Sequence, residues 1–336
     1  MVRLLGLILS SFFISIILFV PFIDFLYKVK LRRHKQLTRD MFNKRTPLFD
    51  KFNSWKVGTP FGGGILIILI VIVWTSWAYG IFNVPINSWA IFVIFFAFIS
   101  FGLLGFYDDF KKLVPTKKSF FGLRFRHKFI IQWILAFIIA WVFYYQLHYD
   151  FINIHGVGEL HLRILYIPFA AFVIVAFVNA FNITDGLDGL ASGLLLICLV
   201  AFLCITATQF DQNQPVGIFL AVLLGSVAAF LYFNIYKARL WLGDVGSLAL
   251  GAVLAVIGLL TGKVLALVII GGIFVVEITS SLIQLLGKKY LGRKILPAAP
   301  FHLYLQKRGW EEPKIVMRAW IIGFFLAILG IFIAFI

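Results

Sequence analysis

Long apolar runs, each about as long as a membrane-crossing helix, alternate with short polar segments along the whole chain. A helix needs roughly 20 apolar residues to cross the hydrocarbon core of a bilayer. Runs of about this length lie at residues 5–25, 61–81, 89–106, 129–147, 164–181, 189–208, 215–234, 245–261, 264–286 and 315–336. The pattern therefore predicts an all-α polytopic membrane protein with about ten transmembrane helices.

The composition supports a membrane protein built as one unit. Of the 336 residues, 62% are hydrophobic and 13% are charged, which is too apolar for a soluble domain. No polar segment is long enough to fold alone, so we expect a single integral membrane domain over residues 1–336. The first run has no small-residue cleavage site and is expected to remain as a helix. Cys198 and Cys204 share one run and give no disulfide framework.

The positive charge is distributed unevenly between the two sides of the predicted bundle. The net charge is +16, and 27 of the 30 Lys and Arg residues fall in alternate loops, at 28–56, 106–128, 235–244 and 287–318. By the positive-inside rule these loops face the cytoplasm and both termini lie outside. The charge is thus mainly a topological signal and does not indicate a nucleic-acid partner. Part of it would also attract anionic lipid headgroups or a phosphorylated substrate.

The predicted inner face also gathers the unusual carboxylates. Asp108 and Asp109 follow the third run, with Lys112 just beyond them. Adjacent helical residues diverge by about 100°, so the two carboxylates are not expected to reach one atom. One would face a site while its neighbour pairs with Lys112. The alternative is a solvated charge cluster at the membrane surface.

A denser polar segment precedes the sixth run. Asn182 or Thr184 is expected to cap the helix that begins there, and Gly186 would let a ligand approach the backbone. Asp185 and Asp188 would share a face if they were helical. Two carboxylates at a helix start call for a metal ion or for hydroxyl and amide donors from a ligand. Simple helix capping is the alternative, but it needs only one of these residues.

Two further segments carry candidate ligand groups. Asp244 stands among small residues, which suits a Mg²⁺ ligand with little bulk nearby. Trp241 would stack on a flat base or serve as an interfacial aromatic residue. Lys56 adjoins a glycine-rich segment at 58–64 that could cradle a phosphate or a polar ring. A turn at the entry to a helix explains these glycines equally well.

Two ionisable residues near the end of the chain have ordinary alternative explanations. His302 lies in the last long loop, where a single histidine is more often a surface residue than a catalyst. Glu277 lies within the ninth run, where an ionisable group is costly. We interpret it as a partner in a hydrogen bond to a residue such as Ser280 or Ser281.

Taken together, the polar segments resemble the polyprenyl-phosphate N-acetylhexosamine-1-phosphate transferase superfamily. Within it they are most similar to the phospho-N-acetylmuramoyl-pentapeptide translocases of bacterial cell-wall synthesis. The resemblance extends from Lys56 to Trp320 and keeps the order and spacing of the motifs. The matching motifs are Lys56-x-Gly-Thr-Pro, Gly105-Phe-x-Asp-Asp-x-x-Lys112, Asn182-x-Thr-Asp-Gly-Leu-Asp-Gly-Leu-Ala191, Leu242-Gly-Asp-x-Gly-Ser-Leu-Ala-Leu-Gly251, Glu277 with Ser280–Gln284, and Gly309-Trp-x-Glu-x-x-Ile-Val-x-Arg318.

The resemblance implies a transfer of phospho-MurNAc-pentapeptide from its UDP carrier to undecaprenyl phosphate. The products would be lipid I and UMP, and Mg²⁺ would be required. The enzyme would act at the inner face of the bacterial cytoplasmic membrane, in the peptidoglycan synthesis that supports cell shape and division. The resemblance leaves open whether the chain forms a homodimer.

The resemblance also implies roles for individual residues. Asp244 would hold Mg²⁺ and Asp109 would support the site, while Asp108 would act as a base, orient the lipid phosphate or serve as a covalent nucleophile. The residues implied to hold uridine are Lys56, Gly186, Leu187, Asp188, Asn234 and Trp241. Those implied to line the phosphate region are Asn182, Asp185 and His302.

The chain departs from the family pattern in the last long loop. Three consecutive histidines are usual there, whereas this chain has His302-Leu303-Tyr304, and Gln306 stands where Glu is usual. Lys237 replaces a proline elsewhere. These departures leave open a sister transferase that moves GlcNAc-1-phosphate or another UDP-sugar. A transporter or lipid flippase is the remaining alternative, but it would place ionisable groups near the midplane, where only Glu277 lies.

Overall fold

The computed structural model describes residues 2–32, 50, 52, 54–84, 88–113, 125–154, 158–208 and 210–336. Within these residues nine helices are long and apolar enough to cross a membrane, and a bent helix pair would supply a tenth crossing. The predicted all-α polytopic architecture is therefore confirmed. Residues 33–49 and 114–124 of the predicted basic loops 28–56 and 106–128 lie outside the described residues.

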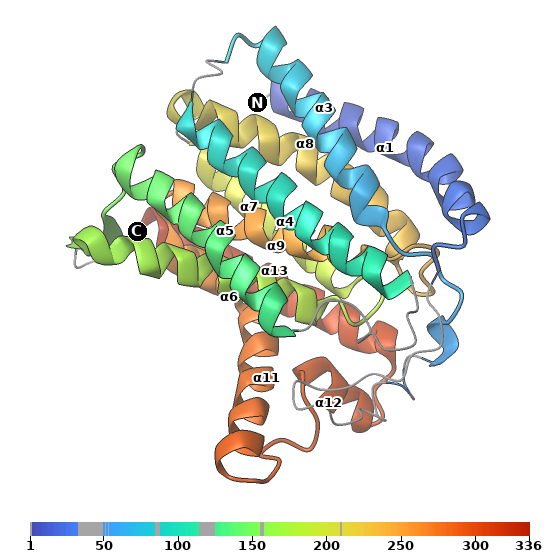
Figure 1. Ribbon diagram of the computed structural model, residues 1–336. Coiled ribbons are helices and arrows are strands. Elements are labelled where there is room, and N and C mark those ends of the chain that lie inside the picture. The colour runs from blue at the N-terminus through green and yellow to red at the C-terminus, as the bar shows by residue number, and fades with distance from the viewer. Residues whose placement is uncertain are drawn as a thin grey trace.

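The helices begin and end close to the predicted limits (Figure 1). The nine long ones are α1 (Val2–Lys28), α3 (Gly63–Ile81), α4 (Trp89–Leu113), α5 (Phe125–Tyr145), α6 (Tyr166–Thr184), α7 (Leu190–Ala207), α8 (Phe210–Asn234), α9 (Gly243–Leu260) and α13 (Glu312–Phe335). The bent pair consists of α10 (Val264–Ile270) and α11 (Gly272–Tyr290). Shorter elements are η1 (Ser54–Lys56), β1 (Phe151–Ile154), β2 (Gly158–His161), η2 (Arg163–Leu165) and α12 (Phe301–Lys307).

Helix α9 lies at the core of the bundle and positions much of the polar chemistry. Every residue from Val245 to Leu260 is buried, and the helix packs against α3, α4 and α6. Its sequence is apolar or small on all sides, as expected for a helix surrounded by other helices. Only its first turn, which carries Asp244, reaches the polar end of the bundle.

Glycines allow the helices to approach closely where the polar residues meet. A Cβ atom at Gly64 on α3 would collide with the backbone of Gly246 on α9, and one at Gly105 on α4 would collide with the Asp244 carbonyl. Small residues at helix contacts in membranes permit this kind of backbone approach. The end of α4 and the start of α9 are thereby brought together.

The predicted ninth span is not one straight helix. It breaks after Ile270, and α11 is bent by 79° from α10. Gly271 and Gly272 occupy the break, and adjacent glycines are a common cause of sharp kinks. The expectation of a continuous run at 264–286 is wrong in this respect. Figure 1 shows α11 projecting away from the bundle with α12 beside it.

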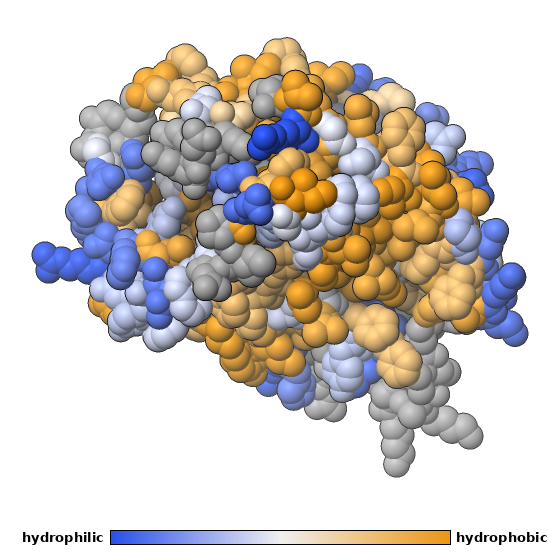
Figure 2. Space-filling model, turned by 90° about the horizontal axis from the view of Figure 1, so that it is seen from above, coloured by the Kyte–Doolittle hydropathy of each residue, from blue (hydrophilic) through white to orange (hydrophobic). Residues whose placement is uncertain are grey.

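The surface and the chain ends fit a membrane-spanning bundle. In Figure 2 apolar residues cover much of the visible face, while hydrophilic residues gather at its left and right edges and in one group above the middle. Both chain ends lie toward the left of Figure 1. Arg3 lies 5.3 Å from the Phe82 ring, beyond the end of α3 that is opposite Gly63. If the bent pair α10–α11 counts as one crossing, the described residues make ten crossings and both termini would lie at the same end of the bundle.

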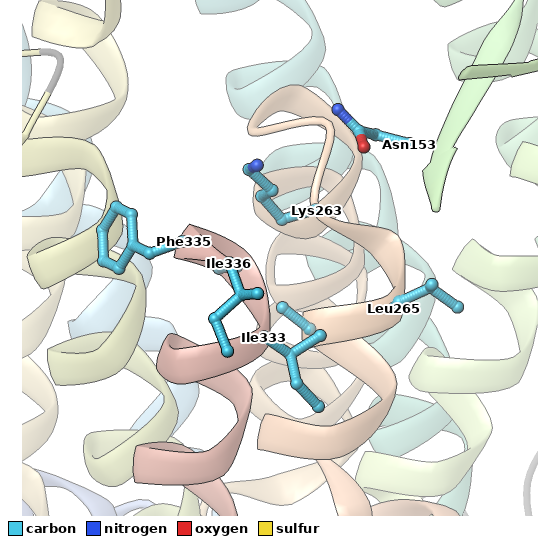
Figure 3. Close-up of a pocket in the computed structure, with 8 residues that line it drawn as sticks. Asn153, Lys263, Leu265, Ile333, Phe335 and Ile336 are labelled. Carbon is cyan, nitrogen blue, oxygen red and sulfur yellow. The ribbon is translucent and has the colours of Figure 1, made fainter. Parts of the chain in front are cut away.

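A small cavity lies at the end of the bundle that carries the C-terminus (Figure 3). It measures about 170 Å³, and its lining includes Asn153 after α5, Lys263 before α10, and Ile333 and Phe335 on α13. None of the residues predicted to act on a substrate contributes to it. The predicted site lies at the opposite end, where the glycine contacts bring α3, α4 and α9 together.

Candidate active site

Three aspartates and two lysines from α4, α5 and α9 form a carboxylate–lysine cluster. Lys128 Nζ lies 2.6 Å from Asp244 Oδ2 and 3.1 Å from Asp108 Oδ2. Lys112 Nζ lies 2.9 Å from the same Asp244 oxygen and 3.2 Å from the same Asp108 oxygen. Both ammonium groups therefore bridge these two carboxylates. The third aspartate, Asp109, lies 3.3 Å from Lys112.

Asp109 also connects α4 to α9. Its Oδ2 atom accepts a hydrogen bond of 3.1 Å from the Val245 amide in the first turn of α9. Neighbouring carboxylates both contact Lys112, because that lysine lies three residues beyond one and four beyond the other. The expectation that they could not reach one atom is wrong. The supporting role implied for Asp109 stays a prediction.

Asn182 joins the cluster from α6. Its Nδ2 atom donates to Asp244 Oδ1 at 3.1 Å and to Ser247 Oγ at 2.7 Å. The predicted capping of the following helix is wrong, because Asn182 and Thr184 lie in the last turn of α6. Helix α7 begins only after the turn at 185–189. Its N-cap residue is Gly189, which makes no side-chain hydrogen bond.

A second group of residues, the Lys56 cluster, surrounds the buried side chain of Lys56. Its Nζ atom lies 2.6 Å from Glu312 Oε1 on α13 and 3.1 Å from Asp188 Oδ1 in the turn. The same ammonium stands 4.6 Å from the centre of the Trp241 ring. A buried ammonium requires such paired carboxylates. A turn at the entry to α3 explains the glycines at 58–64 but does not account for this buried environment of Lys56.

Asp185 belongs to the turn between these two clusters. It is partly exposed, yet desolvation raises the pKa of its carboxyl well above the usual range. The nearby Asp244 carboxylate raises that pKa further, while the Lys56 ammonium opposes the rise. Charges in both clusters thus act on the Asp185 carboxyl, which indicates that the two clusters form one continuous polar site.

His302 is buried against the same turn. Its Nδ1 atom lies 3.0 Å from Glu277 Oε2, and its backbone amide donates to Glu277 Oε1 at 3.1 Å. A Cβ atom at Gly186 would lie only 2.6 Å from His302 Nε2, so the close approach requires glycine. The surface alternative for this histidine is wrong. The interpretation of the Glu277 side chain as a hydrogen-bond partner of Ser280 or Ser281 is wrong as well. Ser280 Oγ donates to the Glu277 backbone carbonyl, whereas the Glu277 carboxylate contacts His302.

Two of the residues implied to hold uridine have structural contacts of their own. Asn234 Oδ1 accepts from the Gly189 amide at 3.2 Å and from Ser192 Oγ at 2.7 Å, and its Nδ2 donates to Leu240 O at 2.9 Å. The Leu187 side chain is buried. Asn234 therefore braces the turn at 185–189 from α8. Direct contact of either residue with uridine remains a prediction.

Three residues of the site were not identified from the sequence as site residues. They are Lys128, Glu277 and Glu312. Lys128 ends a basic loop, where its charge could not be distinguished from the topological signal. Glu277 and Glu312 stood in segments that carry the family resemblance, which was the available signal for them. Their partners lie 25 and 256 residues away, at His302 and Lys56.

The region made of the carboxylate–lysine cluster, the Lys56 cluster and Asp185 has unbalanced charges when all of its groups are ionised. Its ammonium groups belong to Lys56, Lys112 and Lys128, and its carboxylates belong to Asp108, Asp109, Asp185, Asp188, Asp244 and Glu312. Six negative groups thus face three positive ones. A phosphorylated ligand would add further negative charge, so its binding calls for an additional cation. Among the described residues no group of three or more His, Cys, Asp or Glu side chains forms a metal site alone.

Comparison with known proteins gives consistent matches over the region that holds this site. The sequence profile of glycosyl transferase family 4 matches residues 89–262. A phospho-N-acetylmuramoyl-pentapeptide-transferase of Geobacillus thermodenitrificans is 36% identical over 325 residues, covering 96% of this chain and 95% of the relative. Relatives of the same name come from Rickettsia montanensis, 37% identical over 294 residues (82% and 80% coverage), and Acetivibrio thermocellus, 38% identical over 280 residues (82% of each).

Proposed function

Because the chain belongs to glycosyl transferase family 4 and, within it, to the phospho-N-acetylmuramoyl-pentapeptide-transferases, we propose that it makes lipid I. It transfers phospho-MurNAc-pentapeptide from a UDP carrier to undecaprenyl phosphate and releases UMP. The observation that carries this proposal is the pairing of Asp108 and Asp244 by two lysines at one end of a membrane-spanning bundle. The positive-inside distribution supports a cytoplasmic site in the bacterial cytoplasmic membrane.

Transfer of a phosphoryl group depends mainly on positioning and charge neutralisation. An oxygen of the lipid phosphate forms a bond to the sugar-bearing phosphorus as the bond from that phosphorus to UMP breaks. Lys112 and Lys128 neutralise phosphate oxygens, and Asp108 orients the lipid phosphate. Direct attack is favoured over an aspartyl-phosphate intermediate, because a phosphate monoester is already largely ionised, with a second pKa of about 6.

The carboxylate–lysine cluster has a donor set that suits Mg²⁺. Asp108 Oδ2 and Asp244 Oδ2 both contact the Lys128 ammonium nitrogen, so two carboxylate oxygens converge on one positive charge. Mg²⁺ typically binds through one or two carboxylates, water and substrate phosphates. Asp244, with Asp108 beside it, would hold the ion. When bound, Mg²⁺ would offset charge on the diphosphate and improve UMP as a leaving group.

The Lys56 cluster is the proposed place of the uridine. The indole of Trp241 offers a stacking surface for a base, and Asp188 lies close by. The turn at 185–189 then runs from this cluster toward Asp244 and His302, which would bring the diphosphate to the carboxylates.

The donor preference is tested by UMP release from the purified protein with undecaprenyl phosphate and Mg²⁺. UDP-MurNAc-pentapeptide and UDP-GlcNAc are offered in separate reactions. Release with the pentapeptide donor alone is the expected result. Release with UDP-GlcNAc alone would assign the protein to a sister transferase, an alternative favoured by Leu303 and Tyr304 in place of two usual histidines. Silence of the folded protein with both donors would contradict the proposed reaction.

A further inference from the structure

Glu312, the first residue of α13, connects the last helix to the Lys56 cluster. One oxygen, Oε1, accepts from Lys56 Nζ at 2.6 Å and from the Asp188 amide at 2.6 Å. Both partners and Glu312 itself are buried. A single carboxylate thus fixes a charged side chain and the backbone of the turn at the same time. Hydrogen bonds to ionised groups are the stronger class of protein hydrogen bonds.

The position of Glu312 determines which carboxylate oxygen of Asp188 can still accept a hydrogen bond. Asp188 Oδ2 accepts from the Ala238 amide at 3.0 Å. Among the described residues Asp188 Oδ1 has no hydrogen-bond partner, although Lys56 Nζ lies 3.1 Å away as an ion-pair partner. The Lys56 ammonium has three N–H donors and also donates to Glu312 Oε1 and to the Gly186 carbonyl, so its ion pair fills at most one acceptor direction of Asp188 Oδ1. The second lone pair of this oxygen can accept from a ligand. Such an oxygen selects an N–H or O–H donor.

A second contact from α13 supports the same turn. Trp320 Nε1 donates to the Gly189 carbonyl at 3.2 Å, and the indole fills the space beside Gly193 on α7. Glu312 and Trp320 thus hold the turn at both Asp188 and Gly189. The last helix fixes the geometry of a turn more than a hundred residues earlier in the chain.

We propose that Glu312 is a positioning residue for the nucleoside of the UDP donor. It holds Lys56 and the Asp188 backbone so that Asp188 Oδ1 accepts a hydrogen bond from an N–H or O–H of the uridine. Glu312 acts through these two residues and does not touch the reacting atoms. The inference rests on the proposed function, because it assumes that a uridine nucleotide is the ligand.

The test is the affinity of the full-length protein for UMP, measured calorimetrically in detergent for the wild type, Glu312→Gln and Glu311→Gln. Glutamine keeps the shape of the side chain but removes its charge, so UMP binding should weaken about tenfold or more. Glu311 is the adjacent, exposed residue, and Glu311→Gln should bind UMP as the wild type does. In turnover assays Glu312→Gln should raise the KM for the UDP donor and leave the KM for undecaprenyl phosphate unchanged.

Unaltered UMP affinity in folded Glu312→Gln would overturn the inference while leaving the proposed function standing. A wild type that is folded but binds no UMP would overturn the proposed function instead. If Glu312→Gln does not fold, Glu312→Asp provides the same comparison, because it keeps the charge but shortens the reach by one methylene. Its UMP affinity should also fall, and an affinity equal to that of the wild type would count against positioning by Glu312. A general loss of packing would raise both KM values together.

Discussion

At the scale of single residues, the site depends on charges that are paired in an unusual way. Lys112 and Lys128 each contact both Asp108 and Asp244. A cation or a phosphate oxygen bound beside either lysine would therefore change the charge balance of the cluster. In a partly buried site such pairs are much stronger than at an exposed surface. Removal of one lysine leaves carboxylates that the remaining one neutralises incompletely.

Lys128→Met should lower the turnover number by about 100-fold, because it removes one preorganised charge that faces the phosphates. Lys128→Arg should recover part of the loss. Lys111→Met is the matched control, since Lys111 is exposed and lies over the Tyr107 ring. Steady-state UMP release measures all three variants. Equal activity of Lys128→Met and the control would show that Lys128 has no part in the transfer.

At the scale of helices, sequence patterns predicted the membrane-crossing segments better than they predicted which side chains contact one another. The limits of α3, α7 and α9 lie within two residues of the predicted runs, because each crossing needs a similar apolar length. The break at Gly271 was not predicted, since both halves of that run are apolar. Asp108, Asp109 and Asp244 were predicted because the first two form a carboxylate pair near Lys112 and the third stands among small residues. Lys128 and Glu312 were not, because boundary charges are common and only packing shows their partners.

Helices α11 and α12 are coupled through one side-chain pair. Glu277→Gln should lower turnover about tenfold, because glutamine holds the His302 ring less firmly than a carboxylate. The double variant Glu277→Gln with His302→Ala should be no worse than His302→Ala alone, since paired residues are not additive. A multiplicative loss in the double variant would contradict the coupling. The combination of Lys128→Met with Glu277→Gln tests whether the losses of turnover caused by changes in separate clusters multiply.

The crossing of α3 and α9 should tolerate no larger residue at its closest point. Gly64→Ala is expected to lower the thermal unfolding midpoint in detergent by several degrees, because the added methyl group meets backbone that cannot yield without moving a helix. Gly80→Ala on the same helix is the control, since nothing lies within 4 Å of its Cβ position. Equal midpoints for the two variants would contradict the close packing.

At the scale of the whole molecule, the fold gathers residues that are spread along the chain from Lys56 to Glu312 at one end of the bundle. The termini and the small cavity in Figure 3 lie at the other end. The charge distribution predicted an orientation for this arrangement, with the site toward the cytoplasm. The helices alone do not determine which end of the bundle faces the cytoplasm, because apolar helices fit the membrane equally well in both orientations.

Cysteines introduced one at a time into a Cys204→Ser background, in which the remaining native cysteine, Cys198, is buried, test the orientation. Lys307→Cys is on the site end and Glu159→Cys is on the hairpin at the opposite end, and both positions are exposed. In intact cells a membrane-impermeant maleimide should label position 159 and should label position 307 only after the membrane is opened. The reverse pattern would contradict the cytoplasmic site.

The central claim is that Asp244 and its partners carry out Mg²⁺-dependent transfer of a phosphosugar. It is tested most directly by comparing lipid I formation by the wild type and by Asp244→Asn across a Mg²⁺ titration, with equal unfolding midpoints confirmed first. The wild type should require Mg²⁺, and Asp244→Asn should lose about 1,000-fold or more of its turnover at every concentration. Near-normal turnover by folded Asp244→Asn would contradict the claim.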